Sequence, residues 1–266
     1  MKFKRHYFLN YVKEAPLTLA IERAFECELL SKQKFNRPIL DLGCGEGLFA
    51  YILFDEPVDV GIDPNNQELE KAKKYGMHKV LINCFGEKIP KESDSFNTIF
   101  SNSVLEHIPD IEPVLKEAYR LLTAQGEFYI TVPTNLFDRY SIIYQIFILL
   151  RLDSMAERYQ IFFNNFWKHY HHYDNEGWIK LFQKNGFEVK IRKEYCNKNV
   201  CLLNDALTPL SLPGYLSKKI LNRWFLFYRI RKYYSFVLYL IFKRIYTAER
   251  TIKKAGLLFY CLRKIP

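Results

Sequence analysis

The chain has 266 residues, enough for one α/β domain with additions or for two small domains. Hydrophobic residues make up 49% of it and aromatic residues 17%, which excludes a disordered chain because disorder accompanies low hydrophobicity. The net charge of +10 is uneven: residues 214–266 hold 13 Lys and Arg side chains and one acid, whereas residues 1–213 hold 26 basic and 28 acidic side chains. This distribution argues against a basic catalytic domain that binds nucleic acid, and favours a separate basic attachment surface.

The cysteines and the N-terminus bear on location. No pair of cysteines has the spacing of a metal site. Residues 1–16 lack the apolar core and the small-residue cleavage site of a secretory signal. We therefore expect a cytoplasmic protein whose cysteines are reduced, namely Cys27, Cys44, Cys84, Cys196, Cys201 and Cys261.

Strand-like and helix-like patterns alternate along the chain. Residues 15–32 are typical of an amphipathic helix with Pro16 in its first turn. Gly126 is expected in a left-handed conformation after a helix, and Asp174 is expected to cap a helix that ends before Gly186. Alternation of this kind predicts an α/β fold with a parallel sheet covered on both faces. The expected strands are 38–42, 58–62, 79–83, 97–102, 127–132 and 187–195, and the helices between them are 48–54, 67–75, 112–123 and 174–184.

The stretch ILDLGCGEGLFAYIL (39–53) places three glycines directly after the first strand. Ligands of an open parallel sheet lie beyond the carboxyl ends of its strands. Glycine permits positive φ there and lets a ligand lie against bare backbone. The glycines at this position are Gly43, Gly45 and Gly47.

Phosphate-binding motifs do not fit this turn. Leu48 stands where the NAD fingerprint requires its third glycine, and Glu46 would place a negative charge beside a pyrophosphate. The P-loop motif is absent. Asp63, 20 residues after Gly43, is well placed to accept hydrogen bonds from two ribose hydroxyls. The pattern therefore indicates a nucleoside ligand without phosphates.

Several ordered motifs carry a family resemblance. DLGCGEG (41–47), GIDP (61–64), SNSVLEHI (101–108) and LLTAQGEFYITVP (121–133) together resemble the class I S-adenosylmethionine-dependent methyltransferases, in particular the ubiquinone/menaquinone-methyltransferase-like branch. The resemblance implies a seven-stranded, Rossmann-like, doubly wound and mostly parallel sheet, with S-adenosylmethionine as cofactor. It implies that Gly43 and Gly45 pass under the methionine portion, that Asp41 holds its amino group and that Asp63 binds the ribose. The cofactor-binding residues expected in full are Asp41, Gly43, Cys44, Gly45, Asp63, Pro64, Gly86, Glu87 and Ser101.

Two departures and several structural alternatives accompany this resemblance. Phe85 stands where the family has an aspartate for the adenine amino group, and it can only pack on the ring. For the seventh strand, residues 200–203 are the only candidate. Asp41 could instead bond backbone N–H groups of the turn. Asp63 could cap the next helix, with Pro64 as the first helical residue; Glu87 and Ser101 could be ordinary loop residues.

Histidines offer further candidates. His107 lies in VLEHI, a segment beside the methyl donor in similar enzymes, and an imidazole with a pKa near ~6.5 could remove a proton from an acceptor hydroxyl. The alternative is a buried, hydrogen-bonded helix residue. The cluster HYHHY (169–173) is interpreted as a substrate pocket or an ordinary loop. We expect no metal site there, because adjacent histidines on an extended chain face opposite ways and no acidic or cysteine partner has suitable spacing.

Two apolar runs near ten residues long, 141–150 and 233–242, are each flanked by cations. Neither is predicted to span a membrane, since a bilayer-crossing helix needs ~20 residues. If 215–254 were one helix, its cations and its apolar side chains would lie on opposite sides. We therefore predict a helix that lies on an anionic membrane surface; the alternative is a helix packed on the protein, and single-stranded RNA binding is disfavoured. The cations are Lys218, Arg229, Lys232, Lys243, Arg250 and Lys254, and the apolar residues are Leu216, Ile220, Phe227, Tyr234, Leu238 and Ile245.

These patterns predict an N-terminal helical cap (1–35), a methyltransferase domain (36–205) with a substrate-cap insertion at about 134–173, and a basic amphipathic helical tail (206–266). We expect methyl transfer to a small-molecule or lipid-linked acceptor, such as a lipid, quinone or lipid-linked glycan. The protein would be peripheral on the inner membrane face through 214–266, with no nucleic acid as partner. The alternatives are a non-catalytic membrane-attached module that keeps the fold and, less favoured, a hydride-transferring enzyme.

Overall fold

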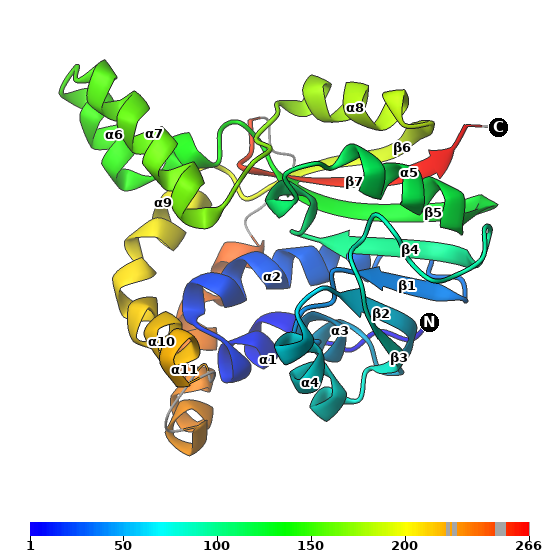
Figure 1. The fold of residues 1–266 in the computed structure, drawn as a ribbon. Helices are drawn as coiled ribbons and strands as arrows, with labels where there is room; N and C mark the ends of the chain where they lie inside the picture. Colours follow the sequence, from blue (N-terminus) through cyan, green and yellow to red (C-terminus); the bar gives the residue numbers. More distant parts are fainter. Residues whose placement is uncertain (222–223, 225–227, 248–253, 266) are drawn as a thin grey trace.

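One seven-stranded sheet organises the molecule (Figure 1). The computed structural model describes residues 1–221, 224, 228–247 and 254–265. All neighbouring strands pair in parallel except around β7, which is antiparallel to both of its neighbours. In sheet order the strands are β3 (His78–Asn83), β2 (Val58–Asp63), β1 (Ile39–Leu42), β4 (Phe96–Asn102), β5 (Leu122–Pro133), β7 (Leu257–Lys264) and β6 (Phe187–Tyr195).

Helices cover both faces of this sheet, and each face has its own apolar core. Successive residues of a strand enter opposite cores: Phe128 packs with one and Tyr129 with the other, as the alternation of side chains in a strand requires. One face carries α1 (Tyr7–Glu14), α2 (Leu17–Leu30) and α3 (Leu48–Leu53), and the other carries α5 (Glu112–Leu121) and α8 (Asn175–Lys184), while α4 (Asn66–Tyr75) packs against β2 and β3.

The six strands predicted from the sequence are confirmed, but the predicted seventh strand is wrong. Residues 200–203 lie in α9 (Lys198–Ala206), whose first turn is capped by the Asn197 side chain accepting from the Val200 N–H at 3.0 Å. The seventh strand is β7, near the end of the segment assigned to the helical tail. Its run LLFYCL is buried throughout, as expected for a strand covered on both faces.

The expectation that Gly126 ends the helix before β5 in a left-handed conformation is also wrong. Gly126 lies inside β5 and is not among the residues with positive φ, because α5 ends at Leu121 and the strand begins at the next residue. By contrast, Asp174 caps α8 as predicted: its carboxylate accepts from the Gly177 N–H at 2.8 Å. Gly186 follows with φ +85°.

The insertion after β5 contains one short turn of helix and a helical hairpin. The hairpin stands away from the sheet beside α9 (Figure 1). Across the described parts of the chain, every helix is either too short or too polar to cross a bilayer. The insertion consists of η2 (Asp138–Tyr140), α6 (Ile142–Leu149) and α7 (Asp153–Trp167). A further short helix, η1 (Leu105–His107), ends the turn after β4.

The expected single tail helix is two helices, α10 (Thr208–Leu221) and α11 (Tyr228–Thr247). Both contact the domain. Lys218 of α10 pairs with Glu46 of the glycine turn, and Trp224 donates to the same carboxylate at 2.6 Å. Arg231 of α11 is buried and donates to the Val12 carbonyl at the end of α1 at 2.6 Å. Phe227 and Arg250 lie outside the described residues, as do the side chains of Arg229, Lys232, Tyr234 and Ile245.

Candidate active site

The glycine turn sits at the carboxyl end of β1. Gly43, Gly45 and Gly47 have φ of +81°, +51° and +78°, a region that L side chains enter only with strain. The N–H groups of Gly43 and Cys44 both donate to the Ile62 carbonyl, at 3.0 and 2.8 Å, and so fasten the turn to β2. A Cβ added to Gly45 would meet nothing within 4 Å. The backbone at Gly45 therefore borders open space that a ligand can fill.

Asp63 ends β2 directly beside this turn. Its carboxylate accepts from the Gly45 N–H at 3.0 Å and from the Asn65 N–H at 2.8 Å. Burial raises its pKa, and these two N–H groups oppose the rise. A carboxylate has about four acceptor sites, so two remain for ribose hydroxyls. The alternative role as helix cap is wrong, because the cap of α4 is Asn65, which accepts from the Gln67 N–H at 3.0 Å. Pro64 is therefore a turn residue before the cap.

Asp41 lies buried in β1 and faces an unexpected partner. Its Oδ2 is 2.8 Å from Nε2 of His78, on β3. The two side chains meet across Gly61 of β2, the strand between β1 and β3. A Cβ at Gly61 would lie 2.5 Å from the His78 ring, so the contact requires glycine at this position. Burial raises the pKa of Asp41, and His78 opposes that rise. The contact of Asp41 with the cofactor amino group stays a prediction.

The remaining predicted cofactor residues surround the same edge of the sheet. Ser101 is buried and donates to the Leu42 carbonyl at 3.1 Å, so it ties β4 to β1. Gly86 packs beside Val114, Glu87 is exposed, and Phe85 is 68% exposed after β3. Cys44 is buried within the glycine turn. Their contacts with the cofactor stay predictions, and an exposed Phe85 is free to pack on an adenine ring.

A cavity of about 260 Å³ lies beside η1. Its walls come from α2, the turn after β4, the insertion, α9 and α10. Arg23, Ser103 and His107 supply polar groups. Phe163, Trp167 and Tyr215 supply aromatic surface. A concave, mainly apolar space with a few polar groups is the usual form of a small-molecule site, so this is the candidate acceptor site.

A buried carboxylate joins α2 to the sheet at this cavity. Glu26 is fully buried and accepts from Arg23 Nη1 at 2.7 Å, from Asn102 at 2.8 Å and from the Tyr195 hydroxyl at 3.0 Å. The Ser103 hydroxyl also donates to it, at 3.1 Å. Ser103 has φ +50°, a strained value for a residue with a side chain. The network holds the N-terminal helices over the carboxyl end of β4.

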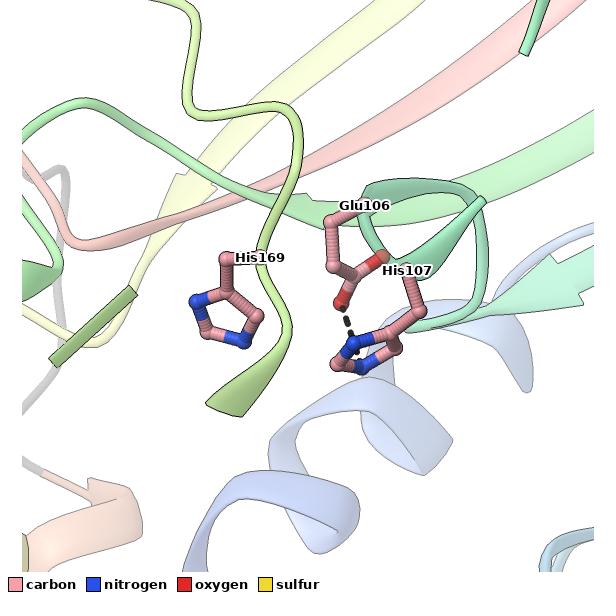
Figure 2. A group of neighbouring side chains, drawn as sticks. All are labelled: Glu106, His107 and His169. Carbon is pink, nitrogen blue, oxygen red and sulfur yellow. Dashed lines mark ion pairs between the residues drawn. The ribbon is translucent and has the colours of Figure 1, made fainter. Parts of the chain in front are cut away.

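Glu106, His107 and His169 converge on the cavity (Figure 2). Glu106 Oε1 lies 3.8 Å from His107 Nε2, and the two imidazole centroids are 5.1 Å apart. Burial raises the pKa of Glu106 to about 8 and lowers that of His169 to about 4. Burial also lowers the pKa of His107, which leaves a neutral imidazole able to accept a proton. The His107 side chain is partly buried: it lies in η1 and is 41% exposed, so the alternative of a fully buried helix residue is wrong.

The sequence does not predict the grouping of these three side chains. The expectation of no metal site rests on spacing along the chain, whereas the partner of His169 is a glutamate 63 residues earlier. The other histidines of the segment point elsewhere: His171 is hydrogen-bonded to the Ile108 carbonyl at 2.8 Å, and His172 is exposed. Only the three-dimensional approach of η1 to residue 169 reveals the cluster.

The strand order and the glycine turn at the end of β1 form the fold of the class I S-adenosylmethionine-dependent methyltransferases. The fold is similar to a solved SAM-dependent methyltransferase from Thermotoga maritima, described as a possible histamine N-methyltransferase. The TM-score is 0.57 at 16% identity, over 93% of this chain and 91% of that one. A family model described as a methyltransferase domain matches residues 13–190. The chain belongs to this family, and its cofactor is S-adenosylmethionine.

Curated relatives match a part of their own length. The chain is 28% identical over 138 residues to the ubiquinone biosynthesis O-methyltransferase of Pelagibacter ubique (strain HTCC1062), over 48% of this chain and 55% of that protein. It is 31% identical over 128 residues to the arsenite methyltransferase of Mus musculus, over 40% of this chain and 34% of that protein. The chain thus spans about half of these relatives or less, and they are named for different acceptors.

Proposed function

We propose that the protein transfers a methyl group from S-adenosylmethionine to a lipid, quinone or lipid-linked glycan, at the cytoplasmic surface of a membrane. The observation that carries the proposal is the two-sided apolar character of α7. Phe163 and Trp167 of this helix line the cavity, whereas Phe162 and Phe166 on the same helix are 61% and 64% exposed. An acceptor with an apolar chain can therefore contact both sides of one helix.

The cavity volume supports an acceptor that extends beyond it. Ligand pockets usually measure about 300–1,000 Å³, so about 260 Å³ suits a ring or head group and leaves no room for a long chain. That chain would lie on the exposed apolar side chains of the insertion. These are Ile143, Ile146, Ile148, Leu149, Leu150, Leu152, Met155, Ile161, Phe162 and Phe166.

Charge supports contact with an anionic membrane. Arg139, Arg151 and Lys243 are exposed beside apolar helices. Leu216 and Ile220 of α10 are 56% and 75% exposed. Exposed apolar groups with neighbouring cations are typical of helices that lie in a membrane interface. The relative named for ubiquinone biosynthesis is consistent with such an acceptor.

The chain's contribution to the reaction is mainly placement. A sulfonium donor is already activated, so holding the acceptor in line with its methyl group supplies much of the acceleration. Gly45 and Asp63 would hold the donor. In the cavity, neutral His107 is the group able to take a proton from an acceptor hydroxyl.

Mass spectrometry of membrane lipid extracts tests this function. Wild-type protein with S-adenosylmethionine should add one methyl group to an acceptor. At a cofactor concentration near the wild-type Kd, Asp63→Ala should add far less, and Asp55→Ala, an exposed acid outside the site, should act as wild type. Cofactor binding without any methylated extract component would contradict a lipid-like acceptor. Failure to bind the cofactor at all would favour the rival, a non-catalytic module that keeps the fold.

A further inference from the structure

We propose that Glu106, His107 and His169 bind one divalent transition-metal ion in the wall of the acceptor cavity. Figure 2 shows the three side chains turned toward a common point, from η1 on one side and from the segment after α7 on the other. Two imidazoles and a carboxylate are a ligand set used by zinc enzymes and by non-haem iron enzymes.

The distances suit an ion after small side-chain movements. The three candidate ligand atoms lie within 4.8 Å of one another, and the closest measured pair, Glu106 Oε1 and His107 Nε2, is 3.8 Å apart. Ligands at about 2.1 Å from a tetrahedral ion are separated by about 3.4 Å. Side-chain rotations that move the ligand atoms by about an ångström would bring them to these separations without a movement of the backbone.

The backbone holds the two contributing segments together. The Tyr170 N–H donates to the Glu106 carbonyl at 2.8 Å, immediately after His169. His107 Nδ1 lies 3.2 Å from the Lys168 carbonyl, immediately before it. A metal-binding histidine commonly donates its second ring N–H to a backbone carbonyl, which orients the other nitrogen toward the ion. This arrangement turns His107 Nε2 toward Glu106.

Glu106 supplies a second, independent observation. Its side chain is buried, with the residue only 3% exposed, and its Oε2 has no hydrogen-bond partner among the residues that the structure describes. A buried polar atom without a partner costs free energy, and a cation would satisfy it. The nearby cation Arg23 has its Nη1 paired with Glu26, at 2.7 Å, rather than with Glu106.

Three protein ligands leave at least one coordination position open toward the cavity. With the ion bound, His107 is a ligand and no longer serves as the base. An acceptor hydroxyl on the ion would instead lose its proton to water more readily, and its oxygen would keep the electron pair for attack on the methyl group. This role rests on the proposed function. Metal binding itself does not, because it needs neither cofactor nor acceptor.

Calorimetric titration of the full chain with ZnCl₂, after treatment with a chelator, tests the site. One equivalent should bind to wild type. Glu106→Gln and His169→Ala should each weaken binding by more than the about 10–100-fold that outer-shell changes cost. The matched control is His172→Ala, which removes an exposed imidazole from the same segment and should leave binding unchanged.

Several results would overturn the metal site. These are a wild type that binds no stoichiometric zinc, a His172→Ala variant that weakens binding as much as His169→Ala does, or two ligand variants that bind zinc as wild type does. Folding of each variant is checked by its circular dichroism and by its affinity for S-adenosylmethionine. Zinc binding without methylation of lipid extracts would refute the proposed function but not the metal site. Methylation of lipid extracts without zinc binding would refute the metal site but not the proposed function.

Discussion

The glycine turn and Asp63, the centre of the expected cofactor site, come from one continuous stretch of chain, whereas the acceptor side is assembled from segments far apart in sequence. Residues 39–65 supply the glycine turn, Asp63 and the strands that hold them. The acceptor cavity draws on α2, η1, α7, α9 and α10. Donor binding therefore depends on local backbone geometry, and acceptor binding on long-range packing. Substitutions can separate the two dependences.

The largest expected effect is a loss of stability on substitution of Glu26, the buried residue of α2 that links this helix to the sheet beside the cavity. Glu26→Ala removes the buried carboxylate that accepts from Arg23, Asn102 and Tyr195, and leaves Arg23 without its ion-pair partner. Breaking a buried pair of this kind costs about 3–5 kcal/mol. Urea denaturation should show that loss. Glu28→Ala, on the exposed side of α2, should change the free energy of unfolding by less than about 0.5 kcal/mol; equal effects would refute the role of the network.

On the cofactor side, Gly45→Ala should weaken S-adenosylmethionine binding by about 30–100-fold, because its Cβ would enter the open space that the ligand needs. Gly76→Ala is the matched control: φ is +66° and a Cβ there also meets nothing within 4 Å. Both substitutions should cost about 1–2 kcal/mol of stability from backbone strain. Calorimetry should show weakened cofactor binding in Gly45→Ala alone, and similar affinities for the two variants would remove Gly45 from the site.

On the acceptor side, the double substitution Phe162→Ser with Phe166→Ser should weaken sedimentation with anionic vesicles by about tenfold, since each exposed ring would lose apolar burial in the interface. Val80→Ser changes an exposed apolar residue on β3 and serves as control. Undiminished sedimentation of the double variant would remove the insertion from the membrane surface. Cofactor affinity should be unaffected in all three proteins.

A smaller effect concerns pH and the cavity wall. Burial raises the pKa of Glu22 to about 7, above the usual value in an unfolded chain. The folded state therefore retains a proton that the unfolded state releases, and the free energy of unfolding falls as pH rises from about 4.5 to 7. Glu22→Gln should remove about 1–2 kcal/mol of that fall. Denaturation at pH 5 and pH 8 measures it; an identical pH dependence in both proteins would contradict this assignment.

The same contrast explains what could be predicted from the sequence. The six strands and the position of Asp63 follow from short-range patterns, namely apolar runs, glycines and an acid at a fixed spacing. No local pattern indicates that His78 pairs with Asp41 across Gly61, because the three residues lie on different strands. His169 and Glu106 likewise meet only through the fold.

The C-terminal region differs from its predicted single helix for a related reason. Its excess of cations favoured one amphipathic helix, yet β7 lies between β5 and β6, two strands formed much earlier in the chain. Arg231, which is not among the cations of the expected basic face, is buried against the end of α1. Charge counts describe the average of a segment, and the burial of a single arginine depends on the surface it meets.

We expect the glycine turn and the carboxylate of Asp63 together to bind S-adenosylmethionine. Calorimetric titration of wild type, Asp63→Ala and Asp55→Ala with this compound measures their contribution. A carboxylate that accepts from a ligand hydroxyl contributes about 1.5–3 kcal/mol, so Asp63→Ala should bind about 10–100-fold more weakly while Asp55→Ala matches wild type. Equal affinity in all three proteins would contradict this expectation.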